Sequence, residues 1–143
     1  MLMSNEGLDL IREFEGLKLT AYQCQADVWT IGYGHTRNVV KGMKITKDEA
    51  DGLLSDDVRG AELCLQGLKI DLTQPMFDAL GSLIFNIGVG AFKASTLCRH
   101  LKEKRFNSAA TQFKRWINAG GIVSNGLVRR REAEEALFRK GIA

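Results

Sequence analysis

The sequence predicts an α+β fold in which a small β-hairpin lobe precedes a larger all-helical lobe. Apolar residues recur at helical spacing along most of the chain, and this spacing changes to strict alternation only between residues 20 and 36. Capping motifs and glycines separate the segments. With 143 residues, 45% of them hydrophobic, the chain can bury a core without disulfides. We expect a single domain over residues 1–143, with an N-terminal lobe over 1–70 and a helical lobe over 71–143.

The first helix is predicted to begin near Ser4 and to end at Gly16. Leu8, Ile11 and Glu15 fall on one stripe of it, so a glutamate ends the helix on its apolar face. Partial burial favours the neutral form of a carboxyl group, and a protonated acid is what cleavage of a glycosidic bond requires. Glu15 is therefore a candidate general acid. The alternative is a helix-end glutamate that bends back to water.

Residues 20–36 are predicted to form a β-hairpin. In the run Trp29-Thr30-Ile31-Gly32-Tyr33-Gly34, large apolar residues alternate with small or polar ones, which is typical of a half-buried strand. The turn is expected over Gln25-Ala26-Asp27, since this segment lacks apolar bulk and aspartate tolerates left-handed backbone. This geometry predicts that Cys24 and Thr30 lie roughly opposite each other across the hairpin.

The rest of the chain is predicted to be helical. Thr46-Lys47-Asp48-Glu49 is a capping box and opens the next helix. The predicted helices run from Thr46 to Leu65, from Asp71–Thr73 to Gly88 as the core helix, from Ser95 or Thr96 to Lys104, from Asn107 or Ser108 to Gly120-Gly121, and from Leu127 to Lys140.

Charge and cysteine content restrict the class of protein. Residues 1–71 carry 8 Lys/Arg and 12 Asp/Glu, whereas residues 72–143 carry 12 and 5. A basic half attracts nucleic acid, anionic lipid or a bacterial cell wall. Three cysteines without an export signal predict free thiols in a reducing compartment, with Cys64 and Cys98 packed in a core. We expect no signal peptide, no membrane span and no metal site.

Several segments, in their order and spacing, closely resemble the phage-type lysozymes, which are muramidase endolysins of glycoside hydrolase family twenty-four. The resemblance covers nearly the whole chain. It rests on Glu15-Gly16-Leu17-Lys18-Leu19-Thr20-Ala21-Tyr22, Trp29-Thr30-Ile31-Gly32-Tyr33-Gly34-His35-Thr36, Ile45-Thr46-Lys47-Asp48-Glu49-Ala50, Phe77-Asp78-Ala79-Leu80, Asn86-Ile87-Gly88 and Gly126-Leu127-Val128-Arg129-Arg130-Arg131.

The resemblance implies a lysozyme-like fold with the active site between the two lobes. It also implies hydrolysis of the β-1,4 bond between N-acetylmuramic acid and N-acetylglucosamine in peptidoglycan, without a cofactor. The catalytic spacing of the family falls on Glu15, Cys24 and Thr30. Many relatives carry aspartate at the position of Cys24, and there the carboxylate and the threonine hold the attacking water while the glutamate protonates the leaving oxygen.

Replacing that aspartate with a thiol leaves three roles open for Cys24. The favoured role is a weak base that orients water with Thr30; the others are a nucleophile that forms a thioglycosyl intermediate, or a site of reduced activity. A small hydrophobe in the hairpin is the non-catalytic alternative. An ionised Glu15 nearby is expected to keep the thiol protonated.

The resemblance also implies supporting residues. An inward-facing Arg130 is expected to approach Glu15, whereas Arg129 and Arg131 are expected on a solvated basic face. His35 and Asp57 are expected to form a structural ion pair. The residues carried over as substrate contacts are Phe85, Asn86, Thr96 and Gln112.

An endolysin of this kind would be a monomer that stays in the host cytoplasm until a separate holin permeabilises the membrane, without inserting into membranes or binding nucleic acid. Two alternatives remain at this point. A lytic transglycosylase would cleave the same bond to a 1,6-anhydro product, and a non-catalytic wall-binding or nucleic-acid-binding protein would use the arginine cluster.

Overall fold

The computed structural model describes residues 1–143, which group into two compact units. The hairpin unit comprises residues 11–59, and the helical unit comprises residues 1–10 and 60–143. The sequence placed its division at residues 70 and 71, whereas the structure groups the first ten residues and residues 60–70 with the later helices. None of the helices is long and apolar enough to cross a membrane.

The first helix, α1 (Asn5–Glu15), has the predicted bounds. Gly16 follows it with φ +73°, and its amide donates to the Arg12 carbonyl at 2.9 Å. A glycine in this left-handed conformation is a common helix stop because it lacks a Cβ. The helix therefore ends on Glu15, as the sequence predicts.

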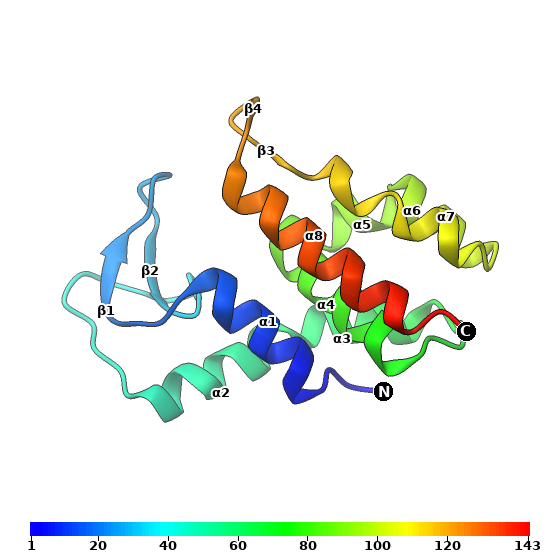
Figure 1. The fold of residues 1–143 in the computed structure, drawn as a ribbon. Coiled ribbons are helices and arrows are strands. Elements are labelled where there is room, and N and C mark those ends of the chain that lie inside the picture. The colour runs from blue at the N-terminus through cyan, green and yellow to red at the C-terminus, as the bar shows by residue number, and fades with distance from the viewer. The chain divides into compact units, whose positions relative to one another are not determined.

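The β-hairpin consists of β1 (Lys18–Gln23) and β2 (Trp29–Gly32), paired antiparallel (Figure 1). Tyr22 lies opposite Thr30, and the Cys24 amide donates to the Val28 carbonyl at 3.0 Å. The expected opposition of Cys24 and Thr30 is therefore wrong. The turn itself lies over Gln25-Ala26-Asp27 as predicted, with Asp27 at φ +60°, and the Asp27 amide closes it on the Cys24 carbonyl at 2.9 Å.

The helix α2 (Lys47–Asp57) begins with the predicted capping box. The Thr46 hydroxyl accepts from the Glu49 amide, and the Glu49 carboxylate accepts from the Thr46 amide, both at 3.1 Å. The predicted continuation to Leu65 is interrupted at Val58, and α3 (Arg59–Gly67) follows as a separate helix. Gly60, a poor helix former, lies in the first turn of α3.

The core of the helical unit forms between α4 (Gln74–Ile87) and α8 (Asn125–Lys140), which pack side by side (Figure 1). Every residue from Met76 to Ile84 is buried, which confirms α4 as the core helix. It ends where Gly88 adopts φ +93°. A helix that is apolar all round is stable only when other elements cover it on all sides.

Short elements connect these two helices. They are α5 (Val89–Lys93), α6 (Thr96–Lys102), α7 (Phe106–Ala110), the 3-10 helix η1 (Phe113–Arg115), β3 (Asn118–Ala119) and β4 (Ile122–Val123). The single helix predicted up to Gly120-Gly121 is therefore wrong. Both glycines have positive φ, +59° and +80°, and make the two-residue turn of a second hairpin instead of capping a helix.

Candidate active site

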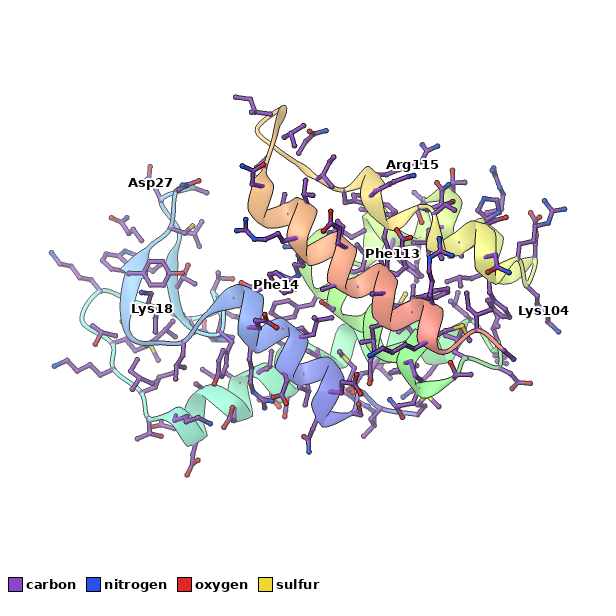
Figure 2. The ribbon with its side chains drawn as sticks, viewed as in Figure 1. Phe14, Lys18, Asp27, Lys104, Phe113 and Arg115 are labelled. Carbon is purple, nitrogen blue, oxygen red and sulfur yellow. The ribbon has the colours of Figure 1, made fainter.

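The three candidate catalytic residues all belong to the hairpin unit. Glu15 is the last residue of α1 and is partly buried, whereas Thr30 in β2 is only 4% exposed. Cys24 directly follows β1 and is partly exposed. It lies near the turn of the hairpin, which Figure 2 marks by Asp27. The sequence pattern therefore brings an acid, a thiol and a hydroxyl into one compact unit.

The sulfur of Cys24 lies in a set of hydrogen-bond donors. Backbone hydrogen bonds from Val28 and then Ala26 lower the pKa of the thiol, partial burial opposes them, and a hydrogen bond from the Thr30 hydroxyl lowers the pKa further. Donors that face a thiolate stabilise its negative charge. The expectation that the charge of Glu15 keeps this thiol protonated is not confirmed, because local donors determine the direction of the shift.

Thr30 connects the thiol to the strand. Its hydroxyl lies 3.0 Å from the Val28 carbonyl oxygen and also reaches the Cys24 sulfur. A hydroxyl has one proton and accepts through its lone pairs. It can therefore donate to the carbonyl when Cys24 is a thiol, and to the sulfur when Cys24 is a thiolate. Cys24 and Thr30 thus share one hydrogen-bond network although they are not directly opposite in register.

Gly34 is a residue of this site that the sequence analysis did not single out. Ile31 and His35 exchange backbone hydrogen bonds at 2.9 Å in both directions, which closes a tight turn after β2. Gly34 lies in that turn with φ +78°, and its backbone packs against the carboxyl group of Glu15. The spacing of Gly34 and Gly32, the last residue of β2, is the signal that could have identified this turn.

A buried ion pair fixes the segment after this turn. The Nδ1 atom of His35 lies 2.7 Å from Asp57 Oδ2, and Nε2 lies 2.8 Å from the Arg37 carbonyl oxygen. The side chains of His35 and Asp57 are only 10% and 14% exposed. This pair connects the end of α2 to the chain that leaves the hairpin.

In the helical unit, Arg130 and Arg131 lie together on the carboxylate of Glu134. Arg130 Nε is 3.2 Å from Glu134 Oε2, Arg131 Nε is 2.8 Å from Oε1, and the Ser82 hydroxyl donates to Oε2 at 2.6 Å. The expected inward orientation of Arg130 agrees with its 3% exposure. Arg131 is 1% exposed, so its expected place on a solvated face is wrong. Burial raises the pKa of Glu134, and the two guanidinium charges oppose that shift.

The residues expected to contact substrate are all in the helical unit. Phe85 and Asn86 lie near the end of α4, where Asn86 Oδ1 accepts from Arg131 Nη2 at 2.9 Å. Thr96 is the first residue of α6, and Gln112 precedes η1, with its side-chain amide 3.3 Å from the Thr111 hydroxyl. Their contact with substrate stays a prediction. No group of three or more His, Cys, Asp or Glu side chains is placed to hold a metal ion.

Comparisons with known proteins identify the family of the chain. The family model described as phage lysozyme matches residues 12–134. An endolysin of Acyrthosiphon pisum secondary endosymbiont phage 1 is 43% identical over 96% of this chain and 98% of its own length. An endolysin of Bacillus phage B103 is also 43% identical, and there the chain spans 55% of the relative's length. The solved endolysin from Escherichia coli O157:H7 phage FAHEc1 superposes with a TM-score of 0.91 at 35% identity, covering 99% and 96% of the two chains.

The helix-rich fold with small antiparallel sheets matches solved lysozymes, which makes the protein a glycoside hydrolase of the lysozyme class. Within this class, the chain belongs to the phage lysozyme family, the peptidoglycan-hydrolysing endolysins.

Proposed function

We propose that Glu15 is the general acid with which this endolysin cleaves the bond between N-acetylmuramic acid and N-acetylglucosamine. A partly buried carboxyl group at the end of a helix is a suitable group to donate a proton to the leaving glycosidic oxygen. The turn that contains Gly34 supports this role, because it limits where the carboxyl group can lie. Hydrolysis then needs a water molecule on the other side of the sugar.

Cys24 and Thr30 orient that water in our proposal. The observation that carries it is the hydrogen-bond network in which the amides of Val28 and Ala26 and the hydroxyl of Thr30 face the Cys24 sulfur. These donors give the thiol part of the anionic character that a carboxylate has in many relatives. A thiolate stabilised in this way accepts a hydrogen bond from water, while its donors reduce its strength as a nucleophile. The reduced nucleophilicity of the sulfur favours the role of a base that orients water over the role of a nucleophile that forms a covalent thioglycosyl intermediate.

The helical unit supplies the remaining roles in this proposal. Arg130 would give electrostatic support to the reaction, and Phe85, Asn86, Thr96 and Gln112 would contact the glycan. Amides and hydroxyls suit N-acetyl sugars because an acetamido group both donates and accepts hydrogen bonds. His35 and Asp57 would hold the hairpin unit in shape through their 2.7 Å contact.

In the phage cycle, we propose that the protein acts as a monomer and lyses the host late in infection. It would remain in the host cytoplasm until a separate holin permeabilises the membrane and gives it access to the wall. This step is tested by expressing the protein in host cells with and without a holin: lysis is expected only with the holin.

The anomer of the first product tests the role of Cys24. A water-orienting base inverts the anomeric configuration, whereas a covalent intermediate retains it. Proton NMR during the first turnovers of a soluble peptidoglycan glycan is expected to show the inverted anomer for the native protein. The Cys24→Asp variant is expected to give the same anomer and to remain active. A retained anomer with the native protein, changed to the inverted one by Cys24→Asp, would instead establish the nucleophile.

A further inference from the structure

A basic segment between the two core helices is not used by the catalytic site. Residues 93–115 carry seven Lys/Arg residues and a single acid, Glu103. They form the end of α5, the helices α6 and α7, and η1. Figure 2 shows Lys104 at the turn after α6 and Arg115 at the end of η1, at the two ends of this part of the helical unit. Positive charge is therefore spread along the whole segment.

Most of this charge is exposed and not neutralised by the protein. Glu103 pairs with Arg105 at 3.3 Å, so the one acid of the segment is already neutralised by a neighbour. The other basic side chains are all exposed and form no ion pair with an acidic group: Lys93, Arg99, Lys102, Lys104, Lys114 and Arg115. Six cations without counter-charges raise the local concentration of polyanions at this surface.

The surface favours a hydrated polyanion over a lipid bilayer. None of the exposed large hydrophobic side chains of the protein lies between residues 64 and 121. Proteins that lie in a bilayer surface combine cations with apolar side chains that enter the acyl region. A basic surface without such anchors matches a chain of phosphate groups in water. The mobile single charge of lysine can contact phosphates without a fixed geometry.

We propose that this basic segment binds phosphodiester polymers that are covalently attached to peptidoglycan, and so holds the enzyme on the wall between cleavage events. The inference rests on the proposed function, since it supplies the wall affinity of a wall hydrolase. The contact is electrostatic, so binding is expected to fall steeply as salt rises.

Two matched triple variants test the proposal in the full chain. The first is Lys102→Gln, Lys104→Gln and Lys114→Gln in the basic segment. The control is Lys41→Gln, Lys44→Gln and Lys69→Gln, which removes the same charge from exposed positions elsewhere. The two sets are also matched in backbone conformation, because each contains one lysine with positive φ: Lys104 at +58° in the first set and Lys69 at +54° in the control. The probes are sacculi that carry poly(glycerol phosphate), and the same sacculi after hydrofluoric acid has removed the polymer.

We expect the first variant to bind untreated sacculi at least about tenfold more weakly at low salt, with a shallower dependence on salt, and the control to bind like the native protein. Stripped sacculi should bind all three proteins equally weakly. Hydrolysis of a short soluble peptidoglycan glycan that carries no phosphodiester polymer should be unchanged in both variants. Equal loss of sacculus binding in both triple variants would overturn the proposal. Binding of the native protein to stripped sacculi as tightly as to untreated ones would also overturn it, as would tighter binding of the native protein to duplex DNA than to the polymer. Failure to hydrolyse the soluble glycan would count against the proposed function instead.

Discussion

The backbone of Gly34 lies directly against the carboxyl group of Glu15. A Cβ atom added at Gly34 would lie 2.5 Å from Glu15 Oε1 and 3.2 Å from its Cδ atom. Gly34 also has φ +78°, a backbone conformation that residues with a Cβ rarely adopt. A Cβ at this position would therefore strain the backbone and would displace the carboxyl group of the proposed acid.

A comparison of Gly34→Ala with Gly42→Ala distinguishes the effect of backbone strain from the effect of displacing Glu15. Gly42 has φ +85° but nothing within 4 Å of a Cβ added there, so it carries only the backbone strain, about 1–2 kcal/mol. We expect both variants to lose similar stability in urea unfolding. Only Gly34→Ala should also lose about 100-fold in kcat/KM, since a displaced catalytic group costs about that much. Equal activity in the two variants would show that Gly34 does not position Glu15.

The hydrogen bonds around Cys24 predict an unusual pH dependence of its reactivity. Because its folded-state pKa is lowered, Cys24 should react with iodoacetamide at a lower pH than a free cysteine. Thr30→Val, which removes one donor, should move this profile to higher pH. Burial raises the pKa of Cys64 and Cys98, so they should stay unreactive in the folded protein and serve as internal controls. Mass spectrometry of the alkylated peptides measures all three sites.

The same shift determines how Cys24 contributes to stability. The pKa of the Cys24 thiol is lower in the folded protein than its value near 9.0 in the unfolded chain. Ionisation of the thiol therefore stabilises the fold, and this contribution is complete when the pH is above the unfolded pKa. This contribution decreases as pH falls through the lowered folded pKa. The difference in unfolding free energy between the native protein and Cys24→Ala should therefore grow as pH rises toward 9. A difference that is constant over this range would contradict the lowered pKa.

The buried carboxylate of Glu134 should be essential for stability. Glu134→Gln removes a negative charge that both Arg130 and Arg131 contact in the core of the helical unit. Breaking such a buried arrangement costs about 3–5 kcal/mol. The matched control is Glu135→Gln, next in sequence, which breaks a partly exposed pair with Arg139 and should cost at most about 1 kcal/mol. Urea unfolding of both variants measures the difference, and equal losses would contradict this account of the cluster.

The contact between His35 and Asp57 gives a parallel prediction in the hairpin unit. Asp57→Asn should lower the free energy of unfolding by about 2 kcal/mol, because a charge-assisted hydrogen bond at 2.7 Å is weakened in a largely buried place. Asp56→Asn, at the exposed neighbouring position, should change stability by less than about 0.5 kcal/mol. Comparable losses at the two positions would show that the ion pair contributes little.

Local patterns in the sequence were sufficient for much of the fold. The stop at Gly16, the capping box at Thr46 and the buried helix that ends at Gly88 each depend on residues within one or two turns. The Gly120-Gly121 pair was misassigned because two glycines end a helix as readily as they turn a hairpin. The residues on both sides of the pair decide between these outcomes.

The details of the site depend on contacts between distant residues. The burial of Arg131 depends on Glu134 and on Asn86, which is 45 positions away, so the helical pattern of α8 alone could not predict it. The contact between Gly34 and Glu15 likewise joins the turn after β2 to the end of α1. The lowered pKa of Cys24 depends on the amides of Val28 and Ala26 and on the Thr30 hydroxyl, whose directions the alternating pattern does not indicate.

The most direct test of the central claim compares Glu15→Gln with Glu13→Gln on purified peptidoglycan. Glu13 is an exposed glutamate on the same helix, so its variant controls for the change of charge. Mass spectrometry of the released muropeptides should show products that have gained one water, formed at native rates by Glu13→Gln and not detectably by Glu15→Gln. Undiminished release by Glu15→Gln, or 1,6-anhydro products from the native protein, would contradict general-acid hydrolysis by Glu15.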